Sequence, residues 1–466
     1  MKKNLTVLSL SLLVLAGLAS CGSTPAASSV AASSSAASSA AASSVASSAA
    51  ASSAVASSEA ASSAAASSSS SAIAYTEYGT GTEISIWMSK KDSQAASDLV
   101  TAYNTANPTA TIKLKVGIME EGDVGNKYTS DPDAVPDIAH VPGDVVTKLI
   151  QNNNIAVFPK ADITANIGTD IAASTLATGQ DADANQYALP FSLNTYWLYY
   201  DKTVFTTPAS IASLTAMKVA AAKANKKTMA FDMANGWFLQ SLFMADGEGI
   251  FKDKGTSATE TYLKGEPALN VAKYIASLYQ DSTSYELGGD ADMKAAVETN
   301  KTCASFVSGS WNYAMAETGF GGAANVGMAA LPNISLGGED TAWQSVGDYK
   351  SVVVSNNSKN KALAQKFAYF LVSKNGQKIR WEDNEGSTMP TSAALAADAD
   401  FVAANKFASV PVFTGERGTF VQNTSTKFGN WWNAGTAFAN AVKAKPTATD
   451  DELKTMLSTL ETALLA

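Results

Sequence analysis

The chain contains few of the residue types that usually carry catalysis or bind metal ions. Its 466 residues include one histidine, His140, and two cysteines, Cys21 and Cys303. A Ser-His-Asp triad, or a metal site built from several histidines, therefore has almost nothing to be built from. Two cysteines support neither a disulfide framework nor a thiolate zinc site. We therefore predict no catalytic residue, no bound metal and no cofactor.

Charge and arginine content narrow the possible ligands further. The chain has 33 Lys and Arg residues against 42 Asp and Glu residues, a formal net charge of -9. Nucleic-acid binders normally present a basic face, so this balance argues against that class. Arg380 and Arg417 are the only arginines. Large phosphate or polyanion ligands are disfavoured, because they favour forked guanidinium contacts.

The N-terminus has the features of a secretory signal. A basic start, Met1-Lys2-Lys3, precedes an apolar run over residues 5–18 and a pair of small residues. The run is shorter than the about 20 residues that a membrane span needs. Residues 18–21, Leu-Ala-Ser-Cys, resemble the lipobox of bacterial lipoproteins. This resemblance implies a signal peptide at 1–20 and a lipid on Cys21, whereas the alternative is an ordinary signal peptide with an unrelated cysteine.

A low-complexity segment follows. Residues 26–72 are all Ala or Ser except Val30, Val45, Val55 and Glu59. Without aromatic and large apolar side chains, such a segment cannot bury enough surface to fold. We expect residues 21–72 to be a lipidated cysteine and a disordered tether, and residues 73–466 to be the globular part. A surface stalk without a mechanical role is the alternative.

The globular part begins with a strand, a helix and a strand. We predict strands at 83–88 and 111–116 around a helix at 93–106, a spacing typical of a parallel βαβ unit. The aromatic-rich run 187–202 is predicted as a strand that leaves one lobe and enters another. Further strands are expected at 136–141, 304–307, 326–331 and 350–354, and helices at 144–152, 270–280, 293–298, 361–372, 376–382 and 450–465.

Several sequence blocks resemble the family-1 extracellular solute-binding proteins of ABC importers, in their maltose and maltodextrin branch. They are Ile84-Ser85-Ile86-Trp87, Pro136-Asp137-Ile138, 187–191 leading to 198–202, 245–247, 306–311, 327–332, 364–371, 386–390 and Trp431-Trp432. The resemblance implies an α/β, two-lobe, periplasmic-binding-protein-like fold of class II, whose lobes are joined by a hinge of crossing strands. It assigns lobe one to about 83–190 plus 351–397, and lobe two to about 195–345 plus 398–466.

In that family a solute binds between the lobes, and sugars offer flat apolar faces for aromatic rings. The ring-stacking positions fall on Trp237, Trp311 and Trp431, with Tyr313 and Trp432 as neighbours. The resemblance places polar contacts at Lys91, Asp92, Asp144, Asn194, Asn235 and Glu121. Two alternatives stay open, since Asp144 could instead cap a helix and Glu120-Glu121 could be a solvated loop.

Three departures from the family pattern change the expected cleft. Val141, Val145 and Gly435 stand where the family has a tryptophan, a basic residue and an arginine. The cleft would therefore be less charged and one ring poorer than in the maltose proteins. We expect His140 to be a packed histidine, and Cys303 to be a small buried hydrophobe.

The predicted function is a lipid-anchored receptor on the extracytoplasmic face of the cell membrane. It would be a monomer, not an enzyme, that delivers maltose, a maltodextrin or another oligosaccharide to an ABC permease. The first alternative is the same fold with a non-sugar solute such as a peptide, polyamine or organic acid. The second is an anchored glycoside hydrolase, which would need two carboxylates facing each other across the cleft.

Overall fold

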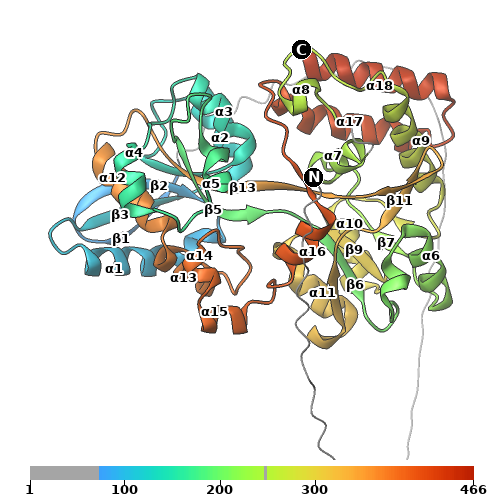
Figure 1. The fold of residues 1–466 in the computed structure, drawn as a ribbon, viewed down its shortest axis with the longest axis horizontal. Coiled ribbons are helices and arrows are strands. Elements are labelled where there is room, and N and C mark those ends of the chain that lie inside the picture. The colour runs from blue at the N-terminus through green and yellow to red at the C-terminus, as the bar shows by residue number, and fades with distance from the viewer. Residues whose placement is uncertain (1–72, 246–248) are drawn as a thin grey trace, which may run out of the picture. The chain divides into compact units, whose positions relative to one another are not determined.

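The computed structural model describes residues 73–466 except 246–248, and its strands form two main sheets (Figure 1). The sheet of the first lobe has seven strands, in the order β1-β3-β2-β4-β13-β14 with β5 also paired to β13. The edge strand β14 pairs only with Ser345–Gly347, where β13 comes from the second lobe. Its strands are β1 Tyr75–Gly79, β2 Thr82–Met88, β3 Ile112–Ile118, β4 Ile138–Pro142, β5 Ala188–Asn194, β13 Ser345–Val354 and β14 Thr419–Val421. Its helices include α1 Ala96–Ala106, α2 Glu121–Ser130, α3 Gly143–Gln151, α4 Lys160–Asn166, α5 Ala173–Leu176, α12 Lys361–Val372, α13 Lys374–Asp383 and α14 Ala393–Ala396.

The sheet of the second lobe has five strands in the order β10-β6-β9-β7-β8, and β11 and β12 form a separate antiparallel hairpin. These strands are β6 Trp197–Asp201, β7 Met229–Ala230, β8 Tyr285–Glu286, β9 Ser305–Ser308, β10 Val326–Ala329, β11 Asn333–Leu336 and β12 Glu339–Ala342. The helices are α6 Leu214–Lys223, α7 Gly236–Met244, α8 Lys252–Gly255, α9 Glu266–Gln280, α10 Asp290–Lys294, α11 Tyr313–Phe320, α16 Val410–Arg417, α17 Trp431–Ala444 and α18 Asp450–Leu465.

The predicted βαβ unit is confirmed. β2 and β3 pair in parallel from Thr82 opposite Ile112 to Met88 opposite Ile118, and α1 lies between them in the chain. Alternating residues of both strands, such as Ile84, Ile86, Leu114 and Val116, are buried in one apolar cluster with α1. The strand β1 was not predicted, and it pairs antiparallel with β3 at the edge of the sheet.

The two lobes are joined by strands, as predicted for the run 187–202. β5 belongs to the first sheet and β6 to the second, so the chain changes lobe between Asn194 and Trp197. β13 and β5 run between the lobes in Figure 1. The Thr195 hydroxyl, buried in this crossing, donates to the carbonyl of Val346 at 2.9 Å. The crossing strands are therefore bonded to each other where the chain changes lobe.

The last change of lobe comes later in the chain than the predicted boundary between residues 397 and 398. The helix α15 Ala399–Ala404 contacts the first lobe, since the ring of Phe401 packs on Trp381 of α13 with centroids 4.9 Å apart. Phe407, a few residues later, packs on Trp197 of the second lobe. The chain therefore changes lobe between residues 404 and 407, and not around residue 397.

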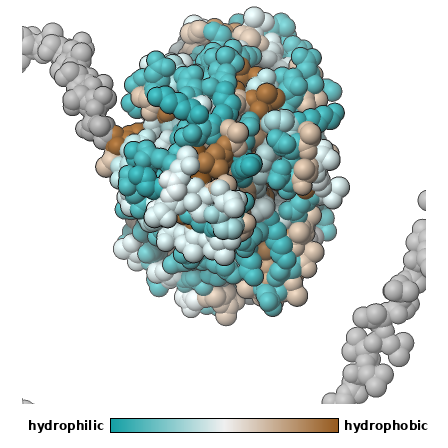
Figure 2. Space-filling model, turned by 90° about the vertical axis from the view of Figure 1, so that its left-hand side faces the viewer, coloured by the Kyte–Doolittle hydropathy of each residue, from teal (hydrophilic) through white to brown (hydrophobic). Residues whose placement is uncertain are grey.

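Each lobe has its own apolar core. The first is built mainly from β2, β3, α1 and α12, and the second from α7, α9, α17, α18 and the strands they cover. On the face shown in Figure 2, hydrophobic residues form small separate areas among hydrophilic ones. None of the helices within the described ranges is both long and apolar enough to cross a lipid bilayer.

Candidate functional site

A cleft of about 1110 Å³ lies between the lobes. Its lining comes from α2, α3 and β13 on one side and from the starts of α7 and α17 on the other. The polar lining includes seven carboxylates and two lysines: Glu120, Glu121, Asp123, Asp144, Asp232, Asp290, Asp348, Lys148 and Lys350. The cleft is large enough for several sugar rings, since drug-sized ligand pockets span about 300–1,000 Å³.

Three tryptophan side chains line this cleft: Trp237, Trp311 and Trp432. Trp237 is in the first turn of α7, whose N-cap Asn235 accepts a hydrogen bond from the Trp237 backbone N–H at 2.9 Å. Trp311 is 42% exposed, which is unusual for so large an apolar side chain. Its ring lies over Gly309, where an added Cβ would come within 2.0 Å of the ring. Glycine at 309 therefore leaves the space that the Trp311 ring occupies beside the backbone.

Trp431 lies outside the cleft, which corrects its assignment as a stacking ring. It is fully buried, packs edge-on against Phe243 and donates from Nε1 to the Gly236 carbonyl at 2.9 Å. Successive residues of an α-helix point about 100° apart, so the two rings leave α17 in different directions, and the Trp431 ring enters the core. Trp432 is the one that does.

Tyr313 also lies outside the cleft. Its ring packs edge-on against Tyr199 and Phe407, and the Lys406 ammonium lies 4.8 Å from its centroid. Tyr313 begins α11, only two residues after Trp311, but it faces the core of the second lobe. Its role is in packing.

Lys91 and Asp92 do not line the cleft either. Lys91 is exposed, whereas Asp92 is only 6% exposed and its carboxylate lies 3.1 Å from Nδ1 of His140. Asn384 donates to the same carboxylate at 3.2 Å, and the Arg380 guanidinium lies 4.0 Å away. Asp92 turns inward because its charge is compensated there, so it has a structural role. The same contacts confirm that His140 is a packed, hydrogen-bonded histidine.

The pKa values of this buried group follow from its contacts. Burial alone would raise the pKa of Asp92, but the hydrogen bond from His140 and the charge of Arg380 hold it below its ordinary value. Burial lowers the pKa of His140, so the imidazole is neutral and Nδ1 carries the proton that faces Asp92. The guanidinium of Arg380 also lies 3.8 Å from the ring centroid of Phe191, which covers it.

Asp144, Asn194, Asn235 and Glu121 all line the cleft. Asp144 lies in the first turn of α3, whose N-cap is Pro142, so it is not the helix cap. Its carboxylate accepts a hydrogen bond from Nε1 of Trp432 at 3.1 Å, which connects the two lobes directly. Burial raises the pKa of Asp144 to about 6.

Glu121 begins α2, and its carboxylate lies 2.7 Å from the ammonium of Lys350 on β13. Its neighbour Glu120 is exposed at the rim and accepts a hydrogen bond from the Lys90 backbone N–H at 3.2 Å. The two glutamates therefore differ: one is paired inside the cleft, and the other is solvated at its edge.

Sequence reasoning missed Asp348 of β13, which also lines the cleft. The carboxylate is 7% exposed and accepts from the backbone N–H of Gly143 at 2.9 Å. Burial, with the charges of Asp144 and Glu121 nearby, raises the pKa of Asp348 to about 7. A Cβ at Gly143 would come within 2.1 Å of this carboxylate, so glycine is required there. The missed signal was a polar residue inside a strand that crosses between lobes.

Among the described residues, one carboxylate and histidine group has ligand atoms close enough for a metal ion: Asp92, Glu121 and His140, within 4.8 Å of one another. Arg380 and Lys350 already neutralise these carboxylates, and their positive charges would repel a cation. We assign the group a structural role.

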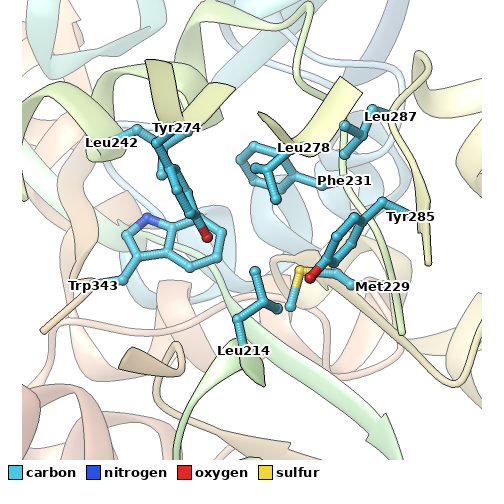
Figure 3. A pocket seen from close by; sticks show the side chains of 9 residues that line it. All are labelled: Leu214, Met229, Phe231, Leu242, Tyr274, Leu278, Tyr285, Leu287 and Trp343. Carbon is cyan, nitrogen blue, oxygen red and sulfur yellow. The ribbon is translucent and has the colours of Figure 1, made fainter. Parts of the chain in front are cut away.

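A second, apolar void lies inside the second lobe (Figure 3). It is surrounded by Leu, Met and aromatic side chains such as Leu214, Phe231, Tyr285 and Trp343. Its volume is about 10 Å³, which is roughly the space for one water molecule. The void is a packing defect of the core and cannot hold a solute. Cys303, as predicted, is a buried residue of this lobe, and burial raises its pKa to about 12; Cys21 lies outside the described residues.

The chain is similar to known bacterial proteins. Residues 98–409 match the family described as bacterial extracellular solute-binding proteins. A galactooligosaccharide-binding protein of Bacillus subtilis is 24% identical over 333 residues, which are 68% of this chain and 75% of that protein. A maltooligosaccharide ABC transporter solute-binding lipoprotein of Streptococcus pneumoniae is 26% identical over 274 residues, 57% of this chain and 62% of that relative, less than two thirds of its length.

Solved structures have the same fold. A structure described as being with acarbose aligns with a TM-score of 0.73 and 26% identity, over 83% of this chain and 99% of that one. The Thermus thermophilus maltotriose-binding protein, bound with maltotriose, aligns with a TM-score of 0.66 and 17% identity, over 82% of this chain and 99% of that one. The predicted two-lobe α/β fold is confirmed.

Proposed function

The chain belongs to the bacterial extracellular solute-binding proteins, and on this premise we propose that it binds an oligosaccharide in the cleft between its lobes. The observation that carries the proposal is that three tryptophan rings share one cleft with many hydroxyl-binding side chains. Rings cover the apolar faces of sugars, while carboxylates and amides bind the hydroxyls at their edges. The names of the relatives, which bind galactooligosaccharides and maltooligosaccharides, support the same class of ligand.

Within this proposal, Trp237, Trp311 and Trp432 stack on the sugar. The hydroxyl-binding side chains are Asp144, Asn194, Asn235 and Glu121. Trp432 connects the two kinds of contact, because its Nε1 already donates a hydrogen bond to the Asp144 carboxylate. A maltodextrin is the leading ligand, with another oligosaccharide as the alternative. Closure of the two lobes around it, by bending at the crossing strands, would give the closed form that docks on a permease.

The remaining parts of the proposal concern the cell. A monomeric protein would be held on the extracytoplasmic face of the membrane by a lipid on Cys21, with residues 26–72 as tether. It would deliver its sugar to the membrane subunits of an ABC importer. The lobe assignment is 83–190 plus 351–404 and 195–345 plus 407–466, which keeps α15 with the first lobe.

We propose no catalytic turnover, since the relatives are named as binding proteins. A glycosidase would need an acid and a second carboxylate about 5–10 Å apart around the scissile bond. Incubation with maltodextrins should leave the sugars intact. Cleavage that disappears on replacing one Asp or Glu of the cleft would overturn the receptor assignment.

One observation favours a second candidate, a polyamine. Seven carboxylates against two lysines make the cleft acidic, and a polyamine site needs carboxylates around aromatic rings. Tryptophan fluorescence and melting temperature, followed against maltodextrins, other oligosaccharides, peptides and polyamines, separate the two. A ligand that binds only the native state raises the melting temperature. A response to sugars supports the first proposal, and a response to polyamines alone replaces it with the second.

A further inference from the structure

Gln422 is a buried polar residue that the sequence did not single out. It follows β14, is 6% exposed and lines the cleft. Neither its side-chain nitrogen nor its side-chain oxygen has a hydrogen-bond partner within the described ranges 73–245 and 249–466. Buried amides are nearly always hydrogen-bonded, because an unpaired buried polar group destabilises the protein. The unpaired amide therefore points to a partner that arrives with the ligand, and the side chain would meet it by turning into the cleft, because both amide atoms are covered as the side chain lies.

The strand pairing places Gln422 beside two other polar residues of the cleft. Asn194 of β5 is the direct partner of Asp348 of β13. On the other edge of β13, Gly347 pairs with residue 421, and the Gln422 backbone N–H donates to the Gly347 carbonyl at 3.3 Å. Continuing that register by one residue sets Gln422 opposite Asp348.

Residues directly opposite each other on neighbouring strands point to the same face of a sheet. Asn194, Asp348 and Gln422 all line the cleft, which agrees with this rule. We call these three residues the hinge row, since they lie side by side where the strands pass between the lobes. Because these strands connect the two lobes that enclose the cleft, we take the row as the base of the cleft.

The chemistry of the hinge row selects among ligands. An amide side chain both donates and accepts, whereas an ionised carboxylate only accepts. A hydroxyl group also does both, so neighbouring hydroxyls on a sugar ring can satisfy the Gln422 and Asn194 amides and the Asp348 carboxylate together. An ammonium group of a polyamine only donates, and it would leave the amide N–H groups of the row without an acceptor.

We propose that Gln422 is a ligand-binding residue that, with Asn194 and Asp348, binds neighbouring hydroxyls of one sugar ring at the base of the cleft. This inference rests on the proposed function, because it assumes a sugar ligand. The proposal adds polar contacts to the hydroxyl edge of the sugar at the hinge, beside the stacking contacts that the tryptophan rings make with its faces. The sugar ring that lies at the hinge would therefore depend on its free hydroxyls more than the other rings of the ligand do.

The test uses the purified protein and its Gln422→Leu variant, titrated with maltotriose by calorimetry. We expect the affinity to fall about ten-fold, the effect of losing hydrogen bonds to a buried hydroxyl. The melting temperature without ligand should stay the same or rise, because the variant removes an unpaired buried amide. Gln344→Leu is the matched control, since Gln344 is near the hinge but bonds to the Arg417 carbonyl at 2.7 Å and does not line the cleft.

A second measurement follows single hydroxyls. The ligands are maltotrioses that each lack one hydroxyl. For the parent protein, at least one of them should bind about ten-fold more weakly than maltotriose. For the Gln422→Leu variant, that same sugar should bind as well as maltotriose, because the contact it lacks is already gone. If Gln422→Leu binds maltotriose like the parent while Trp311→Ala binds it weakly, the hinge row is wrong and the sugar receptor stands. If the parent ignores every sugar and binds spermidine, both the proposed function and the hinge row are wrong.

Discussion

Two buried aspartates show how the first lobe and the base of the cleft differ. Asp92 and Asp348 are almost equally buried, at 6% and 7% exposure. The hydrogen bond from His140 and the charge of Arg380 overcome the effect of burial and lower the pKa of Asp92. Burial raises the pKa of Asp348 to about 7, and its charged neighbours Asp144 and Glu121 add to the shift.

The difference teaches that burial alone does not identify a binding residue. A buried charge with its partners in place holds the fold together, and it has nothing left to offer a ligand. A buried carboxylate or amide without enough partners destabilises the free protein and gains when a ligand supplies them. On this criterion the Asp92 carboxylate, which has His140, Asn384 and Arg380 around it, is structural, whereas Asp348 and Gln422 belong to the site.

The largest expected effect comes from removing a partner of Asp92. Arg380→Met keeps the apolar contact with Phe191 but leaves the buried carboxylate without its guanidinium. We expect a loss of about 3–5 kcal/mol in stability, as is usual when one member of a buried ion pair is removed. Urea unfolding measures it. Asp348→Asn is the control and should be as stable as the parent or more so; equal losses in both variants would remove the distinction between the two regions.

The next effect is a pH dependence that belongs to Asp348. Its pKa is about 7 in the folded protein against an ordinary value of 3.8. The folded state therefore binds the proton more tightly, so the contribution to stability is present below pH 4 and is lost as the pH rises to 7. The Asp348→Asn variant does not lose stability in this way, because an asparagine side chain does not titrate.

The stability of Asp348→Asn relative to the parent should thus increase by about 2–4 kcal/mol between pH 4 and pH 7.5, at about 1.4 kcal/mol per pKa unit. Unfolding at a series of pH values measures the difference, which cancels the titration of groups common to both proteins. Asp144 and Glu121 face the same carboxylate, so Asp144→Asn should reduce the pH dependence of the parent. A difference that does not change with pH would show that Asp348 is paired in solution.

Rings can be compared in the same way. Trp311→Ala should lose about 1–3 kcal/mol of maltotriose binding, because the exposed ring is available for stacking. Its stability should fall by less than that of Trp381→Ala, since 42% of the Trp311 surface is already exposed. Trp381→Ala, a half-buried ring of the first lobe that packs on Phe401, should have the opposite pattern, with lower stability and unchanged binding. Loss of binding in both variants would mean that overall stability controls affinity.

Local patterns predicted much of the fold. The alternation in residues 83–88 and 111–116 gave the paired strands β2 and β3, because each buries alternate side chains against α1. Local patterns could not tell which of the two adjacent tryptophans, Trp431 or Trp432, stacks on the ligand. Whether Trp431 or Trp432 faces the cleft depends on how α17 rotates against α7, where the Trp431 ring meets Gly236.

The hinge row was invisible for a related reason. Gln422 joins Asp348 only because β14 pairs with β13, and the two strands are far apart in the chain. Sequence periodicity describes which face of a strand is buried, but it does not say which distant strand lies beside it. The same holds for Asp92, whose inward direction is set by Arg380 from a distant helix. The sequence therefore predicted local structure, such as strands and the buried face of each, but not the contacts between elements that are distant in the chain.

The smallest expected effect is at the rim of the cleft, where side chains are exposed and neither the pairing nor the lack of pairing of a buried group matters. Glu120 is exposed, and its contact is to the backbone of Lys90. Glu120→Gln should therefore change stability and maltotriose affinity by less than about 0.5 kcal/mol, because exposed charges interact weakly and salt screens them. Glu121→Gln, its neighbour in the chain, breaks the 2.7 Å ion pair with Lys350 and should cost more. Equal effects of the two substitutions, measured by calorimetry at low and high salt, would mean that burial and pairing at the cleft do not control the energetics of its carboxylates.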